Sequence, residues 1–219
     1  MDAEQSWRVI EGERRSLADL LEDLTQEQWD APSLCAGWRV RDVAAHVAMA
    51  PQVPGIGSML ADAARARGRF HTFNQNAAVR HAARPTEQIV SELREFAASR
   101  RLPVVTNYRN ILFDVLVHGQ DIAIPLGLPR DMPIDAASAG AERVWTMGWP
   151  FWARRRLRRL RLQATDVQWS VGEGPEVRGP IGALLLLLTG RPAALPGLTG
   201  DGVPELTARL VRPAESAAR

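Results

Sequence analysis

The sequence contains no lysine, so its 27 basic side chains other than histidine are all arginine. They nearly balance 25 acidic residues, and the formal net charge is only +2. The pI of about 9.4 is high because guanidinium groups stay protonated throughout the accessible pH range. A high pI of this origin does not indicate the strongly basic surface of a nucleic-acid-binding protein.

Cysteine occurs once, as Cys35, which excludes an internal disulfide. The first residues, MDAEQSW, lack the basic and apolar segments of a secretory signal peptide. The longest apolar run, residues 183–188, is far shorter than the roughly 20 residues that span a bilayer. We therefore expect a cytoplasmic protein that does not insert into a membrane.

Apolar residues at helical spacing predict that the first part of the chain is mainly α-helical. Helices are expected over 3–24, from Arg39 to the residue before Pro51, and over 56–83, 86–100, 107–122 and 136–152. Arg14 interrupts the apolar stripe of the first helix. Thr25 and Gln28 are spaced as a capping box for a short turn, and Thr86 is a candidate N-cap.

The character of the sequence changes after residue 155. Residues 160–172 alternate as two short strands, glycines supply turns, and residues 181–188 form a buried helix before a short mixed tail. We predict a helical bundle over 1–155 and a small α+β unit over 156–219.

One stretch, NYRNILFDVLVHGQDIAIPLG, carries polar residues on one line of an otherwise apolar helix. Asp114 and His118 lie four positions apart, so their side chains point the same way one turn apart. That spacing lets a carboxylate oxygen and an imidazole nitrogen meet one zinc ion at about 2.0–2.2 Å. Alternatively, the line is the solvated face of an amphipathic helix, and a histidine such as His46 is a hydrogen-bonded core residue. His71 and His81 lie among alanine and arginine and are not candidates.

Two separated segments resemble a known family. Residues 24–48, LTQEQWDAPSLCAGWRVRDVAAHVA, are similar to the amino-terminal signature of the mycothiol-dependent maleylpyruvate isomerases, relatives of the DinB-like metal-binding bundles. Residues 114–127, DVLVHGQDIAIPLG, resemble that family's second signature, an acid followed four positions later by histidine. The resemblance implies a mainly α fold with a DinB-like antiparallel four-helix bundle, and a metal held by His46, Asp114 and His118. The family pattern has glutamate where this chain has Asp114.

Three protein ligands leave a coordination position open, as in catalytic sites. A thiol bound there loses its proton and becomes a nucleophile. Because Cys35 is the only cysteine, the thiol must come from outside, and the resemblance implies mycothiol. We expect a metal-dependent isomerase or thiol S-transferase, with zinc as the metal, that acts on a small electrophile. The alternative is a non-enzymatic sensor or carrier of a metal or thiol on the same fold, and the ligand set also suits iron(II) and nickel.

Three further residues have two interpretations each. Asp121 is a candidate to orient the His118 imidazole, or else a helix-end residue without a special role. Arg191 is a candidate to bind a carboxylate of substrate or cofactor, or else a cation that stabilises the end of a helix. Cys35 is interpreted as a small buried residue and not as a nucleophile, because no histidine or aspartate partner is apparent near it in the sequence.

The strongest charge run is ARRRLRRLRL, with six arginines from Arg154 to Arg161. It is either a patch for phosphate or anionic lipid, or a solvated face between domains. No aromatic residue interrupts the run and no nucleic-acid motif accompanies it, so we do not expect a nucleic acid as partner. The sequence leaves open whether the chain forms a homodimer.

Overall fold

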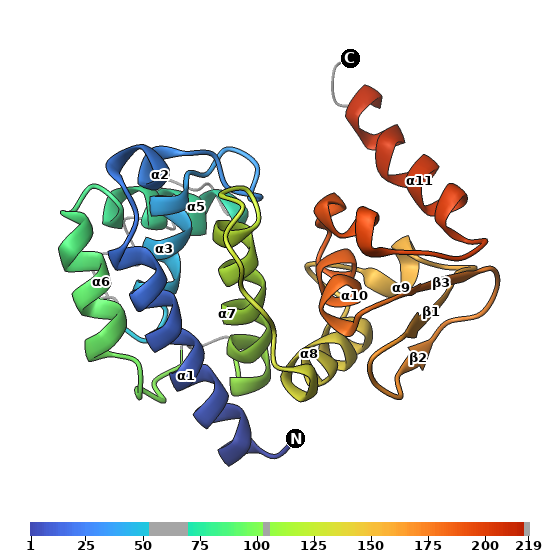
Figure 1. The fold of residues 1–219 in the computed structure, drawn as a ribbon, viewed down its shortest axis with the longest axis horizontal. Coiled ribbons are helices and arrows are strands. Elements are labelled where there is room, and N and C mark those ends of the chain that lie inside the picture. The colour runs from blue at the N-terminus through green and yellow to red at the C-terminus, as the bar shows by residue number, and fades with distance from the viewer. Residues whose placement is uncertain (53–69, 103–105, 217–219) are drawn as a thin grey trace. The chain divides into compact units, whose positions relative to one another are not determined.

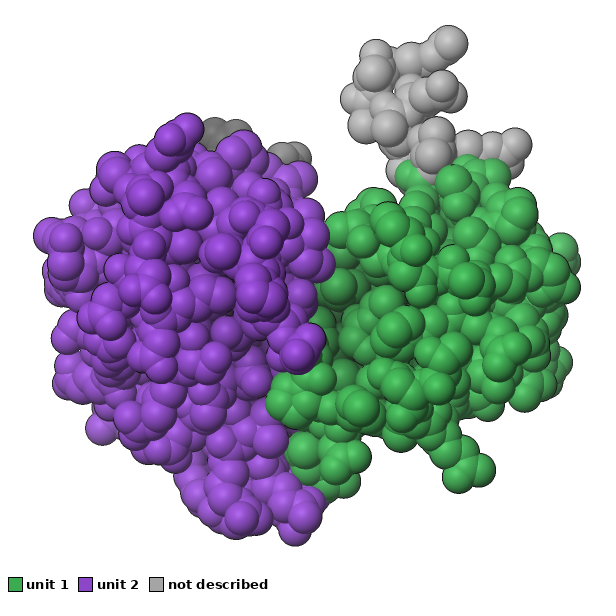
Figure 2. Space-filling view, viewed as in Figure 1, with its two compact units in different colours: residues 1, 132–219 green, residues 2–131 purple. Residues whose placement is uncertain are grey.

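The computed structural model describes residues 1–52, 70–102 and 106–216 (Figure 1). The chain divides into two compact units, residues 2–131 and residues 132–219 with Met1 (Figure 2). The predicted boundary at residue 155 falls inside the second unit, because helix α8 (Ile134–Thr146) packs against α10 (Ile181–Leu188). Of the helix predicted over 56–83, residues 56–69 lie outside the described residues, and α5 (Phe70–His81) is its described part.

The first unit is a bundle in which each of four helices packs against two of the others. These are α1 (Ala3–Glu22), α3 (Val40–Met49), α6 (Thr86–Glu95) and α7 (Tyr108–Ala123). Helices α1 and α3 each contact both α6 and α7, while the short α2 (Gln26–Asp30) and α5 pack on α3. Helices α1 and α7 run in one direction and α3 and α6 in the other (Figure 1). The expected mainly α, DinB-like antiparallel four-helix bundle is confirmed.

Short side chains fix where these helices begin. The predicted capping box at Thr25 and Gln28 is present, with each side chain bonded to the other residue's backbone N–H. Asn107, placed on the polar line of its helix by the sequence, instead caps α7 and accepts from two backbone N–H groups. The prediction for Thr86 was wrong, because Pro85 is the N-cap and Thr86 is the first helical residue.

Arg14, the interruption in the first apolar stripe, is buried in the bundle with 1% of its surface exposed. Its Nη1 donates to the carbonyls of Phe96, Ala97 and Ser99 at distances of 2.9–3.3 Å. Burial lowers the pKa of Arg14 to about 10, and the charge of Asp114 opposes this shift, so the side chain stays protonated at neutral pH. The arginine therefore satisfies the carbonyls that follow α6.

In the described residues, the second unit combines four α-helices, α8 to α11, with a small sheet of order β2-β1-β3. Strand β1 (Arg161–Ala164) pairs antiparallel with β2 (Ser170–Val171) and parallel with β3 (Glu176–Gly179). Two strands over 160–172 were predicted, whereas β3 was interpreted as turn because of its flanking glycines. The buried helix α10 covers the predicted residues 181–188.

Two predictions for this unit need correction. The helix expected to reach residue 152 ends at Thr146, ahead of Pro150, whose ring cannot continue a helix, and the short α9 (Ala153–Arg156) follows. The tail expected to be mixed forms α11 (Val203–Ser216), beyond the short 3-10 helix η1 (Pro192–Gly197). Among the helices that the structure describes, none is both long and apolar enough to cross a bilayer.

Candidate metal centre

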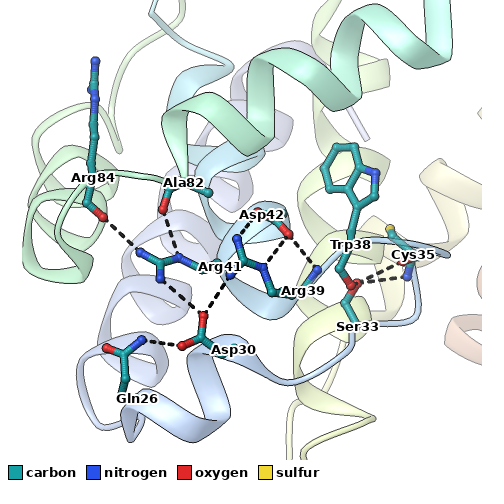
Figure 3. A network of polar contacts seen from close by, with 10 residues as sticks. All are labelled: Gln26, Asp30, Ser33, Cys35, Trp38, Arg39, Arg41, Asp42, Ala82 and Arg84. Carbon is teal, nitrogen blue, oxygen red and sulfur yellow. Dashed lines mark hydrogen bonds and ion pairs between the residues drawn. The ribbon is translucent and has the colours of Figure 1, made fainter.

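A polar network holds the loop between α2 and α3 and sets where α3 begins (Figure 3). The guanidinium of Arg39 donates to both carboxylate oxygens of Asp42 at 3.2 Å, and its backbone N–H donates to Asp42 at 2.8 Å. Arg39 and Arg41 both donate to Asp30 Oδ1, at 3.1 and 3.3 Å. The charged residues of the WRVRD segment therefore fix the loop and the start of α3.

The same loop carries Cys35 and Trp38 toward α7. Ser33 Oγ donates to the Trp38 carbonyl at 2.9 Å and accepts from the Cys35 N–H at 3.1 Å (Figure 3). The Leu34 N–H donates to the carbonyl of Asp121 at 3.1 Å, which ties the loop to α7. The loop thus packs against the part of α7 that holds His118 and Asp121.

His46 on α3 faces Asp114 and His118 on α7. Asp114 presents one oxygen to each histidine: Oδ2 lies 3.6 Å from His46 Nε2, and Oδ1 lies 3.4 Å from His118 Nε2. The candidate ligand atoms of the three residues all lie within 4.8 Å of one another.

These spacings fit a divalent metal. Ligand atoms about 2.1 Å from a zinc ion at tetrahedral corners lie about 3.4 Å apart, close to both measured carboxylate–imidazole distances. The side chains of His46, Asp114 and His118 are 21%, 30% and 13% exposed, so a small molecule can approach them. Three protein ligands with one accessible side are the donor set of a catalytic metal site.

Aromatic rings flank this group. The imidazoles of His46 and His118 meet edge to face, with centroids 4.9 Å apart, and the Trp38 ring packs edge-on to His46 at 5.7 Å. Trp38 lies in the loop that Arg39 and Ser33 hold. Because the Trp38 ring contacts His46, this loop also limits the movement of the His46 ring.

Asp121 is fully buried and lies behind His118. Its Oδ2 is 2.9 Å from His118 Nδ1, the nitrogen that does not face Asp114. A carboxylate on the far nitrogen is the usual partner of a metal-bound histidine, since it fixes both tautomer and ring orientation. Asp121 is thus in contact with the imidazole that it was predicted to orient, and the role itself stays a prediction.

Cys35 has partners that sequence reasoning missed. Its Sγ lies 3.1 Å from Asp121 Oδ2 and 3.9 Å from His118 Nδ1. No partner was apparent near Cys35 in the sequence because these partners are more than 80 positions away in the chain. Cys35, His118 and Asp121 form a second group with metal-ligand atoms close together, but in it the His118 Nδ1 already bonds to Asp121.

Asp114 and His118 form a charge pair in the metal-free protein. Burial alone would raise the pKa of Asp114. The charge of His118 and hydrogen bonds with both imidazoles outweigh burial and hold this pKa well below its usual range. Burial alone would lower the pKa of His118. The charge and hydrogen bond of Asp114 outweigh burial and raise this pKa well above its usual value, with smaller contributions from Asp121 and Cys35. A metal that binds His118 must therefore displace a proton.

Comparison with known proteins found a family that matches most of the first unit. Residues 10–102 match the family described as the mycothiol maleylpyruvate isomerase N-terminal domain. This part of the chain is similar to that family. The match includes His46 and the loop before it and ends ahead of Asp114 and His118.

Solved structures extend the likeness to most of the chain. A mycothiol-dependent maleylpyruvate isomerase has 14% sequence identity and a TM-score of 0.63, with 92% of this chain and 93% of that chain covered. A histidine-to-alanine mutant of such an isomerase has 13% identity and a TM-score of 0.58 at the same coverage. At these identities the likeness shows a shared fold. A comparison with curated proteins gave no match.

The resemblance implied a glutamate at the position where this chain has Asp114. Its shorter side chain nonetheless places one oxygen within 3.6 Å of each histidine nitrogen. The substitution therefore leaves the three candidate ligands within reach of one ion.

Arg191 lies in the second unit, directly after Gly190. Its Nη1 donates to the carbonyl of Thr189 at 2.7 Å, which is the contact expected of a cation at the end of a helix. Its charge also lowers the pKa of the neighbouring Arg156, after the larger effect of burial.

Proposed function

We propose that this protein is a metal-dependent enzyme, with zinc as the metal, that activates an external low-molecular-weight thiol such as mycothiol. The activated thiol serves either isomerisation of a small electrophile or S-transfer to it. The observation that carries the proposal is that the candidate ligand atoms of His46, Asp114 and His118 lie within 4.8 Å of one another on partly exposed side chains.

Each residue has a separate role in this proposal. His46, Asp114 and His118 would hold the metal, and a metal bound there makes a coordinating thiol a thiolate at neutral pH. Asp121 would hold the His118 ring with Nε2 toward the other ligands.

The position of Cys35 supports an external thiol. Its sulfur faces Asp121 and the Nδ1 side of His118, whereas Asp114 faces Nε2 on the other side of the ring. Cys35 is therefore not directed at the position that the three ligands share. Its contact with Asp121 makes it a positioning residue, since it acts through Asp121 on His118.

Arg191 is proposed to bind a carboxylate of the substrate or of the thiol cofactor. On this proposal, Arg191→Gln raises the KM for a carboxylate-bearing substrate and leaves the metal content unchanged. An unchanged KM would leave Arg191 with only its contact to the Thr189 carbonyl.

Elemental analysis tests the metal assignment directly. Protein purified without chelators should contain a full equivalent of metal, and His46→Ala and His118→Ala should each lose it together with activity. His81→Ala is the matched control, because His81 lies in the same unit but bonds to Glu92. Retention of a full equivalent by either ligand variant would show that the assignment is wrong.

Thiol consumption separates an enzyme from a sensor or carrier. The protein should consume mycothiol, or turn it over, with at least one member of a panel of small electrophiles that includes maleylpyruvate. Activity should be lost when a chelator removes the metal and should return when zinc is added back. Metal and thiol binding without turnover of any electrophile would favour the non-enzymatic alternative.

A further inference from the structure

The arginine run of the second unit borders an open cavity of about 800 Å³, a volume typical of small-molecule sites. One wall is formed by α9 and the residues on either side of it, and the other by Glu205 and Arg209 of α11. All lining residues belong to the second unit, and none of them contributes to the candidate metal centre.

The charge of the lining is strongly one-sided. Five guanidinium groups face a single carboxylate, that of Glu205, and this carboxylate is paired with Arg209. In the part of the chain that the structure describes, no ion pair joins an acidic side chain to the other four arginines, which are Arg155, Arg156, Arg158 and Arg159. The cavity therefore concentrates positive charge on a chain whose net charge is only +2.

Backbone contacts hold two of these arginines in place. Arg156 donates to the carbonyls of Phe151 and Leu187 at 3.2 and 2.9 Å. Arg209 donates to the carbonyls of Arg156 and Arg158 at 3.3 and 2.7 Å. The remaining arginines project from a turn that these contacts fix, so their positive charge is arranged before a ligand arrives.

The cavity wall also contains unusual backbone. Trp152 and Arg159 adopt left-handed conformations, with φ of 50° and 62°, and among the described residues no other non-glycine residue has a positive φ. Such conformations cost free energy for residues with large side chains and concentrate at binding sites.

An aromatic side chain adjoins the cationic cluster. The Trp152 ring packs on Gly148, where an added Cβ would lie 3.1 Å from the ring, yet the residue remains 52% exposed. An exposed indole supported from behind provides a surface on which a flat group can stack.

We propose that this cavity binds a small organic polyanion that carries phosphate or carboxylate groups and a planar portion. Arg155, Arg158 and Arg159 would bind the anionic groups through charge-assisted hydrogen bonds, and Trp152 would stack on the planar portion. A concave site favours a small ligand over a lipid surface or a duplex, which need flat or extended contacts. The proposal does not depend on the function of the metal centre.

Calorimetric titration of the full chain tests the proposal with ADP, pyrophosphate, citrate and adenosine as probes. ADP should bind saturably, and neutral adenosine should not bind. At least one of pyrophosphate and citrate, which lack a planar ring, should bind more weakly than ADP. The double variant Arg155→Gln, Arg159→Gln should weaken ADP binding by at least about tenfold, because two charge-assisted contacts are lost. Trp152→Leu should weaken ADP binding and leave that of pyrophosphate unchanged.

Arg8→Gln is the control, since Arg8 is an exposed arginine of the other unit. Circular dichroism verifies that each variant is folded. The proposal is overturned if none of the anionic probes binds at millimolar concentration, if the double variant binds ADP as the wild type does, or if only anionic vesicles or duplex DNA bind.

Discussion

Replacing Asp121 by asparagine tests the candidate centre without removing a ligand. In the wild-type protein, Asp121 Oδ2 lies near both His118 Nδ1 and Cys35 Sγ, at 2.9 and 3.1 Å. Partners of this kind are typically worth 10-fold to 100-fold in metal affinity, or about 1.4–2.7 kcal/mol. Because Asp121 is fully buried and solvent does not screen its charge, we expect a loss near the upper end, about 100-fold.

The pH dependence of this loss separates two effects of Asp121. Asp121 contributes to the raised pKa of His118, so it also stabilises the proton that competes with the metal. Below that pKa, apparent zinc affinity falls about tenfold for each pH unit, and the fall begins at lower pH in Asp121→Asn. The two proteins should therefore differ most at the alkaline end of the range, where protons compete least with the metal in both.

Competition with a chromophoric zinc chelator, from about pH 6 to about pH 9, measures both effects. Asp131→Asn is the matched control, because Asp131 is an exposed aspartate of the same unit. Equal zinc affinities of Asp121→Asn and the wild type at the alkaline end would refute the role assigned to Asp121.

Three further variants test other parts of the bundle. Arg14→Met should lower the free energy of unfolding in urea by about 3 kcal/mol, since three carbonyls lose their donor. Burial alone would raise the pKa of Glu92, but hydrogen bonding and the charges of His81 and Arg84 outweigh burial and lower this pKa. Glu92→Gln should therefore lower the free energy of unfolding by about 2 kcal/mol at pH 7. The difference between the two proteins should disappear as pH falls below about 4, because Glu92 then becomes protonated in the wild type. Cys35→Ala should keep its metal and most of its thiol-dependent activity, within about threefold, whereas inactivation with the metal fully retained would identify Cys35 as a nucleophile.

Local signals were sufficient for much of the fold. The capping box at Thr25 and the uniformly apolar α10 lie within a few residues of the features that define them, so the sequence located both. Strand β3 was missed because its pairing with β1 joins segments separated by an intervening strand, and because Val177 is the only large apolar residue among its four residues.

The candidate site was predictable to different degrees. Asp114 and His118 are one helical turn apart, so their shared direction follows from the sequence. His46 is on another helix, and only the family resemblance linked it to them. The contact of Cys35 with Asp121 had no signal in the sequence, because it depends on how the loop before α3 packs on α7.

The sequence by itself determined the helical periodicity, most helix boundaries and the i, i+4 pair, because these depend on contacts between near neighbours in the chain. The tertiary structure alone decided that Arg14 is buried against the carbonyls after α6, that Cys35 lies beside Asp121, and that the arginine run borders a cavity with Trp152. Each of these depends on packing between distant segments, which composition and periodicity leave undetermined.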